Sequence, residues 1–437
     1  MANMANEMIK QLWHERFFAS EDDVKKLKDT DDLAKYFADI REDILVKDGS
    51  RPSVYDTEIW NGLEEPMTAD IGIVPVSRYP LLAPFDAQAP KFKRNGYEIS
   101  LPPINLEDPR NRRCAEEGTG WFVSTVLKRK LQTVPTLTMA KNSILRRAGL
   151  DCPTFNRDEN SRNFKALESK RRAELITECL GLCSKRAKVV IRYGEVFAVR
   201  SEEFVPMAEE DVYNTVLKTI RADHPDAAFR EGAVSLPYGI LSIALNDPLQ
   251  EEGFRARLAG MKSPIKCDSL KAGVTLSMSN VGQAAITVSC FYEADGRRIR
   301  LGTAVRMTHD AGASLDALAD KCSKLGAQFK DAEEKIERLG AMDVEHVGDA
   351  IRAVAKRYNL PAAAEEVAAE CDVQFPAGGS GLDCYLALCD IADRQAASGK
   401  MPADRQADLG EKVAALMDLP FDRYGQDGTW EAIESAS

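Results

Sequence analysis

The sequence predicts an α+β protein with a mixed or antiparallel sheet and packed helices. Two observations point to this class: strand-like runs lie at 233–245, 272–292 and 298–307, and a sustained helical heptad pattern follows them. Of the 437 residues, 44% are hydrophobic and 29% are charged, which is ordinary for a globular chain. No apolar run reaches the roughly 18 residues that a membrane helix needs, so no membrane partner is expected.

The N-terminal quarter is predicted to be a helix followed by an irregular arm. Residues 7–45 have helical spacing, with Ser20 as the N-cap and acids at 21–23 in the first turn. Residues 50–110 hold nine prolines, which prevent long helices and favour a docked arm or a linker. The short run Ile71–Val76 is expected to be an edge strand.

The next segment is predicted to alternate between helices and strands. Residues 119–131 fit a strand or a short helix, while 137–148 and 161–184 have helical spacing. The stretch VVIRYGEVFAVR, ending at Arg200, resembles two strands around a turn at Tyr193-Gly194-Glu195. A helix is expected over 208–222, and Asp295-Gly296 marks a hairpin turn between the last two strand-like runs.

A long antiparallel helical hairpin is expected over about 314–358. Its first stripe repeats in steps of three and four: Leu315, Leu318, Cys322, Leu325, Phe329, Ala332, Ile336 and Leu339. Gly340 interrupts the pattern and Asp343 can cap a second helix, whose stripe is Val344, Val347, Ile351 and Val354. The stripes are buried within the chain, or part of the seam is an oligomer contact. Further helices are expected at 382–397, after a glycine-rich linker, and at 404–418.

These elements divide the chain into five predicted parts. They are an N-terminal helical segment (1–48), a Pro-rich arm or linker (49–118), a basic helical region (119–187), a sheet-containing α+β core (188–310) and a C-terminal helical region (311–437).

The charge distribution is strongly uneven. Residues 91–200 contain 23 Lys and Arg against 12 Asp and Glu, a local net charge of about +11, whereas the remainder carries 35 against 57, or −22. Several cations acting together are what phosphate binding needs, and interleaved aromatic residues such as Trp121 can stack on bases. The alternative is that the cations pair with acids of the same chain or of another copy.

The candidate nucleic-acid-binding residues come from these basic clusters. They are Lys128, Arg129, Lys130, Arg146, Arg147, Lys170, Arg171, Arg172, Lys185, Arg186, Arg192, Tyr193 and Arg200. The stretch 140–157 also has a helix, a glycine-containing turn and room for a second helix, which is the pattern of a helix-turn-helix.

Searches for catalytic and cofactor motifs give nothing. The sequence has no phosphate loop, no dinucleotide-binding glycine pattern, no nucleophile elbow and no zinc-protease helix, so no cofactor, metal or catalytic residue is predicted. His309 is the histidine beside strong strand signals, and a structural role is favoured over a catalytic one. The ten cysteines are expected to be reduced, with most of them in the core.

Part of the chain resembles a known family. The matching stretches are VVIRYGEVFAVRSEEFVPMAEEDVYNTVLKTI (189–220), GVTLSMSNVGQAAITVSCFY (273–292), RMTHDAGAS (306–314) and the late Gly428-Thr429-Trp430. On these residues, about 188–431 resembles an uncharacterised phage- and plasmid-borne family, the domain of unknown function nine-three-two. Members often carry a Cys-x-Asn-Gly element after the serine-containing strand, where this chain reads RRIRLGTAVRM instead. The resemblance implies a mobile-element context and no specific activity.

The function expected from these features is non-enzymatic nucleic-acid binding. The leading hypothesis is a phage- or mobile-element-encoded protein that binds single strands, or assists recombination or replication, as a homo-oligomer in the host cytoplasm. The first alternative is a structural or assembly protein of a virion or mobile-element particle. The second is an enzyme whose site is not recognisable in the sequence.

Overall fold

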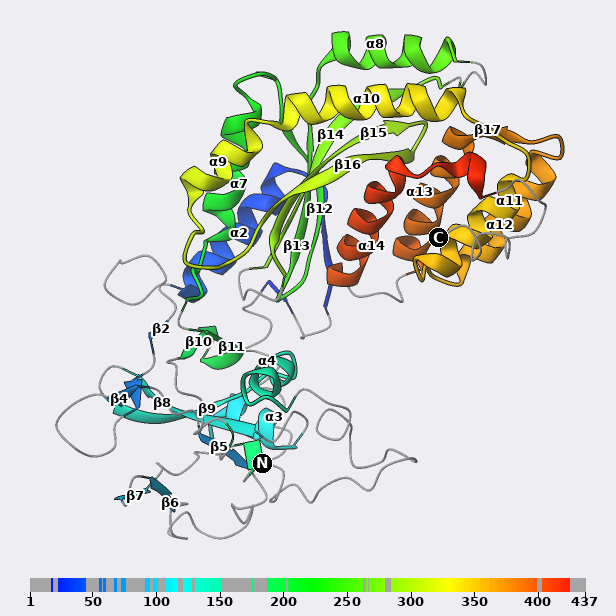
Figure 1. Ribbon diagram of the computed structural model, residues 1–437. Helices are drawn as coiled ribbons and strands as arrows, with labels where there is room; N and C mark the ends of the chain where they lie inside the picture. The colour runs from blue at the N-terminus through cyan, green and yellow to red at the C-terminus, as the bar shows by residue number, and fades with distance from the viewer. Residues whose placement is uncertain are drawn as a thin grey trace.

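The computed structural model describes residues 17–18, 23–44, 107–116, 121–127, 130–150, 187–192, 194–201, 203–261, 267–279, 284–398 and 403–424, with short strands between 55 and 100 and a few isolated positions. The predicted α+β class is confirmed, because an antiparallel sheet is packed against helices (Figure 1). A smaller group of strands and helices lies beside this main body.

The main sheet has six strands in the order β1-β12-β13-β14-β15-β16. Every neighbouring pair is antiparallel. The strands are β1 (Lys25–Leu27), β12 (Ala228–Val234), β13 (Gly239–Ala244), β14 (Leu270–Met278), β15 (Ile286–Ala294) and β16 (Arg297–Met307). From β12 onwards, strands that follow each other along the chain are also neighbours in the sheet, so this part is a simple meander. The turn predicted at Asp295-Gly296 joins β15 to β16, and both residues have positive φ (47° and 82°), as a tight primed hairpin turn requires.

The two faces of the sheet differ in chemistry because side chains alternate along each strand. On β14, Val274 and Leu276 point to one face and Thr275 and Ser277 to the other. The register extends both sets across the sheet: Val274 is paired with Cys290, and Thr275 with Ser289. We call these the apolar face and the hydroxyl face.

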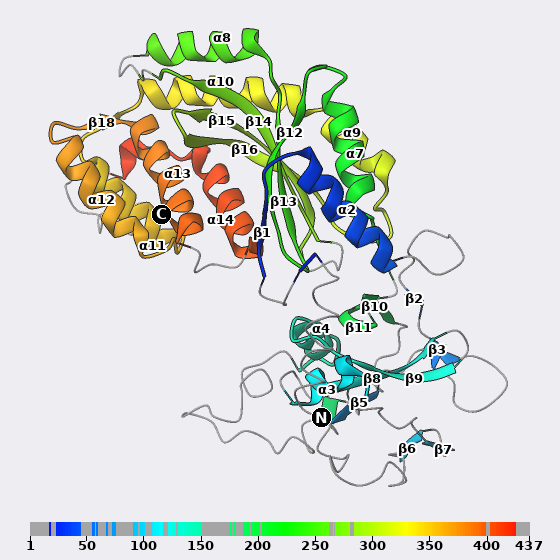
Figure 2. The same cartoon turned by 180° about the vertical axis from the view of Figure 1, so that it is seen from behind.

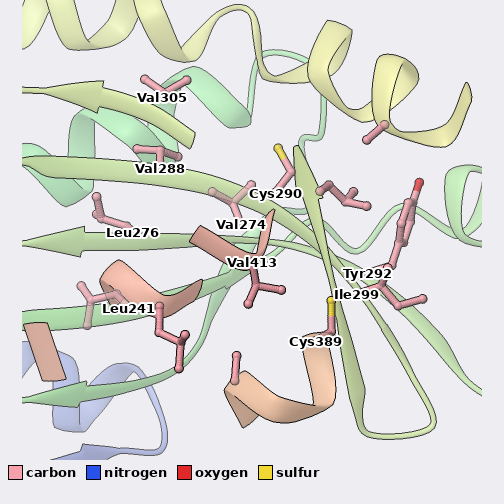
Figure 3. Close-up of a cluster of buried hydrophobic side chains, with 14 of the residues drawn as sticks. Leu241, Val274, Leu276, Val288, Cys290, Tyr292, Ile299, Val305, Cys389 and Val413 are labelled. Carbon is pink, nitrogen blue, oxygen red and sulfur yellow. The ribbon is translucent and has the colours of Figure 1, made fainter. Parts of the chain in front are cut away.

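The helices that cover the apolar face include α7 (Glu209–Ile220), α8 (Pro248–Ala259), α9 (Leu315–Cys322) and α10 (Leu325–Ala341). Tyr292 lies at the centre of this layer. Its ring is stacked on Phe254 of α8 at 4.0 Å between centroids and meets Phe329 of α10 edge-on at 5.6 Å. Figure 3 shows Tyr292 among buried hydrophobic side chains of the main core cluster, which also includes Cys389 and Val413 of later helices.

The C-terminal helices form a second group at the β16 side of the sheet (Figures 1 and 2). The elements are β17 (Asp343–Val344), α11 (Val347–Arg357), α12 (Ala363–Gln374), β18 (Gly379–Ser380), α13 (Gly381–Ala397), α14 (Ala403–Ala415), η2 (Leu416–Asp418) and η3 (Phe421–Arg423). The predicted linker before α13 is instead a strand and a helix cap, because Ser380 and Asp383 form a reciprocal capping box.

The predicted helical hairpin has different partners in the structure. The heptad stripe is present and, apart from Leu315, buried, but it is divided between α9 and α10. The helices α10 and α11 do not pack along each other; α10 packs on β16 and α13, while α11 packs on α12 and α13. The physical reason is that Asp343–Val344 pairs with β18, which redirects the chain before α11 begins.

The helix predicted over 7–45 is interrupted by a strand in its described part. The structure has the strand β1 at Lys25–Leu27, paired with β12, where the sequence predicted helix. Helix α2 covers Thr30–Ile44 and is capped by Asp29, while the predicted cap Ser20 lies outside the described residues. The Asp29 carboxylate accepts hydrogen bonds from the backbone of Asp31 and Asp32 at 3.0 and 2.9 Å.

Smaller sheets make up the part of the molecule that includes the basic region. Their elements are β2 (Tyr55–Asp56), β3 (Glu58–Ile59), β4 (Met67–Thr68), β5 (Gly72–Pro75), β6 (Lys91–Arg94), β7 (Tyr97–Ser100), α3 (Pro109–Glu116), β8 (Trp121–Leu127), β9 (Lys130–Pro135), α4 (Ala140–Arg147), β10 (Ala187–Arg192) and β11 (Glu195–Ser201). The predicted edge strand is confirmed as β5, paired with β8 alone. The predicted hairpin is confirmed as β10 and β11.

Several predictions fall on residues outside this description. Most of the helix predicted at 161–184, the second helix of the possible helix-turn-helix after Leu150, and Gly428-Thr429-Trp430 lie there. Of the eight cysteines that are described, six are buried and all are free thiols, which confirms the prediction that most lie in the core.

Candidate anion-binding site

A cavity of about 530 Å³ lies where α4, β11 and the end of β16 meet. Four arginines and a histidine contribute to its lining: Arg146, Arg147, Arg200, Arg306 and His309. We call this the arginine pocket. Its members come from three segments that are far apart in the sequence, so only the fold brings them together.

Ser143 connects α4 to β11 and so places two of the arginines. The side chain is buried; its Oγ accepts a hydrogen bond from the backbone N–H of Val199 at 2.9 Å and donates to the carbonyl of Ala140 at 2.7 Å. Arg146 and Arg147 follow Ser143 by three and four residues, which is one helical turn, so they lie on the same side of α4. Arg200 follows Val199 directly and reaches the same cavity.

His309 is fixed just beyond the end of β16. Its Nδ1 lies 3.1 Å from the carbonyl oxygen of Val205, and the Val205 N–H donates to the carbonyl of His309 at 3.1 Å. Because a carbonyl only accepts, Nδ1 carries the hydrogen, and Nε2 of the neutral ring is an acceptor. Nε2 is buried and has no hydrogen-bond partner among the described residues. Burial, assisted by the charge of Arg200, lowers the pKa of His309 below its usual value.

The electrostatics of the pocket are those of crowded positive charge. Burial, together with the nearby charge of Arg146, lowers the pKa of Arg200 to about 10. Asp310 is the single acid among the described lining residues. Its carboxylate accepts hydrogen bonds from the hydroxyl of Thr308 and from the N–H of Gly312, which lower its pKa and hold it within its own turn. Arg306 also lies 3.7 Å from Glu411 of α14. Among the described residues, the lining therefore holds four arginines against one acid.

The structure brings together three of the thirteen residues predicted to contact nucleic acid. These are Arg146, Arg147 and Arg200. Arg192 lies elsewhere: it is 4% exposed, donates to the carbonyl of Leu236 at 3.3 Å and lies over the ring of Phe197. The side chains of the others are outside the described residues: Lys128, Arg129, Lys130, Lys170, Arg171, Arg172, Lys185, Arg186 and Tyr193.

Two members of the pocket, Arg306 and His309, were not predicted as binding residues. His309 does make the structural contact that the sequence favoured, through Nδ1, and the residue also contributes to the pocket lining. The sequence pattern that could have identified them is Arg306-x-x-His309 at the end of a clearly predicted strand. Loops that follow strands commonly carry functional side chains.

Another basic cluster, at residues 110–113, forms ion pairs with acids of the same chain. Arg113 forms an ion pair with the buried Glu195, and Arg110 forms one with Asp108 at 2.5 Å. The Arg110 guanidinium lies where a Cβ on Gly194 would be, so glycine is needed at this hairpin turn, where φ is +75°. Part of the positive charge of residues 91–200 is therefore matched by acids of the same chain.

Comparisons with known proteins add no relative. No protein-family model, no curated protein and no solved structure matches the chain. In the part of the chain that the structure describes, no helix is long and apolar enough to cross a membrane. The same residues contain no group of three or more His, Cys, Asp or Glu side chains placed to hold a metal ion.

Proposed function

We propose that this protein binds nucleic acid, preferentially single-stranded, through the arginine pocket and without catalysing a reaction. The observation that carries the proposal is the convergence of four arginines on one cavity whose described lining contains one acid. Guanidinium groups bind phosphate oxygens with paired hydrogen bonds, and several acting together give a site selective for phosphate-bearing chains.

A polymer fits this surface better than a small free anion. The pocket contains the end of α4 and the end of β11, both within the segment whose net charge is about +11. These ends of the pocket therefore belong to the part of the sequence that is richest in positive charge, which favours a polyanion over a single small anion. A single strand is favoured because its backbone can bend into a recess, whereas a duplex presents its phosphates along a regular, stiff surface. A role on a mobile element is proposed from the sequence resemblance alone, since no family model matches the chain.

The test is fluorescence anisotropy of a labelled single-stranded oligonucleotide over a series of salt concentrations. Each phosphate neutralised on a single strand changes the slope of log K against log salt by about −0.7, so four arginines predict a slope of about −3. The double variant Arg146→Gln/Arg147→Gln should reduce the magnitude of that slope by about 1.4.

The matched control removes the same charge at a distance from the arginine pocket. Arg255→Gln/Arg257→Gln alters α8, which lies far from α4 (Figure 1), and should leave the slope unchanged. An absence of binding at low salt, a slope near zero, or equal losses in the two double variants would each overturn the proposal. A duplex of the same sequence tests the strand preference.

A further inference from the structure

A second cavity, of about 320 Å³, lies on the hydroxyl face of the main sheet. Residues of β13, β14 and β15 form its floor, and residues of α13 and α14 form its roof. The volume is at the lower end of the range for small-molecule pockets, which suits a ligand with a single ring. No residue lines both this cavity and the arginine pocket, so the two sites are distinct.

The floor is an ordered array of hydroxyl groups. Ser242, Thr275 and Ser289 are consecutive partners across three strands, and Ser277 pairs with Thr287 in the next row on the same face. All five line the cavity. Neighbouring strands are about 4.8 Å apart, so the hydroxyls form a grid with that spacing. Each hydroxyl can donate one hydrogen bond and accept two, and the grid can therefore bind a ligand that offers both donors and acceptors.

Ser242 is the strongest sign that the floor is built to bind something. Its side chain is only 4% exposed, and among the described residues its Oγ has no hydrogen-bond partner. A buried hydroxyl without a partner costs free energy, so native proteins usually satisfy it with protein, water or ligand. The position of Ser242 in the cavity floor means that an occupant of the cavity can satisfy it.

The charged side chains around the cavity are balanced. Three basic and three acidic residues contribute to the lining: Lys26, Arg298, Arg300, Glu231, Asp393 and Glu411. Arg300 donates to Asp393 at 2.7 Å and to the carbonyl of Cys389 at 3.2 Å, and Arg298 lies 3.4 Å from Glu231. With this balance the cavity favours an uncharged ligand over an anion or a cation.

The roof leaves the space open because it is made of small residues. Ala396 of α13 and Ala407 and Gly410 of α14 face the floor. At Gly410, a Cβ would lie 3.3 Å from Nε of Arg300, so a larger residue there would press on the ion pair with Asp393. The combination of a small-residue roof and a hydroxyl floor keeps the cavity both open and polar.

From these observations we infer that the hydroxyl-face cavity binds a small, uncharged, polyhydroxylated molecule of the monosaccharide class. The hydroxyl grid supplies the hydrogen bonds, the balanced rim excludes net charge, and the roof sets the size. This inference does not depend on nucleic-acid binding at the arginine pocket.

The test uses saturation-transfer NMR with glucose and ribose as neutral probes and glucose 6-phosphate as a charged one. Saturable binding of a neutral sugar is expected, with glucose 6-phosphate binding no more tightly than glucose. Ser242→Ala removes the unpartnered hydroxyl and Ala407→Leu fills the space under the roof; each should weaken binding by at least about tenfold. The matched control Ala415→Leu makes the same change at an exposed position of α14 and should bind as the native protein does.

Two further outcomes decide the inference. The variant Arg146→Gln/Arg147→Gln should bind the neutral sugar normally, which separates this site from the arginine pocket. If neither neutral sugar binds saturably, the cavity holds water alone and the inference is wrong. It is equally wrong if binding survives Ala407→Leu in a variant that melts like the native protein, or if the phosphorylated sugar is preferred.

Discussion

Removing one hydroxyl group, that of Tyr292, should measurably destabilise the main sheet. The Tyr292 hydroxyl donates to Oε1 of Glu333 at 2.6 Å and accepts from Nε2 of Gln250 at 3.0 Å, so it connects β15 with α10 and α8. Tyr292→Phe keeps the stacked ring and loses only these contacts. A hydrogen bond to a charged group contributes about 1.5–3 kcal/mol and a neutral one about 1 kcal/mol. Because the Glu333 side chain retains some contact with solvent, we expect a total loss of about 2–3 kcal/mol.

The assay is urea denaturation followed by circular dichroism, with a double-mutant cycle on Glu333. Burial and the neighbouring Glu333 raise the pKa of Tyr292, so the hydroxyl keeps its proton and its role as donor at neutral pH. Tyr292→Phe and Glu333→Gln should couple by about 1–2 kcal/mol, because both changes act on one hydrogen bond. Additive losses, or a loss below about 0.5 kcal/mol for Tyr292→Phe, would refute this reading of the interface.

Four other substitutions test separate parts of the fold. In thermal melting, Gly273→Ala should lower the free energy of unfolding by about 1–3 kcal/mol, because the added Cβ would lie 2.4 Å from Cζ of Phe291. Gly253→Ala lies on the open surface of α8 and should instead raise the free energy of unfolding by about 0.4–1 kcal/mol. Ser380→Ala should cost about 1 kcal/mol in chemical denaturation by removing the α13 cap. The pKa of His309 is lowered in the folded protein, so between that pKa and about 6.5 the unfolded chain binds more protons than the folded one. The free energy of unfolding should therefore fall as the pH falls through this window. The fall should be smaller in His309→Gln.

Local features of the fold could be predicted because their causes are local. Asp295-Gly296 fixes a turn by its own backbone preferences, and the stripe from Leu318 to Leu339 identifies which side of the helices is buried. The stripe does not identify its partner. Several elements offer an apolar surface, and α10 packs against β16 and α13 rather than α11 because a short pairing at Asp343–Val344 redirects the chain.

The candidate site was predictable only in part, for a similar reason. Arg146, Arg147 and Arg200 stand out as a local excess of positive charge, which a count of residues can detect. Arg306 lies outside the basic segment of residues 91–200, and it joins the others only because β16 ends beside α4 and β11. The charge count also could not separate Arg200, in the pocket, from Arg192, which is buried against Leu236.

The most direct test of the central claim is to map where a nucleic acid touches the protein. A single-stranded oligonucleotide containing bromouracil can be cross-linked by ultraviolet light, and the modified peptides identified by mass spectrometry. The arginine pocket predicts cross-links in peptides that contain Ala140–Arg147, the end of β11 at Arg200 and the segment from Arg306 to Asp310. Cross-links confined to α8 and α11–α14, with none in those three segments, would contradict it.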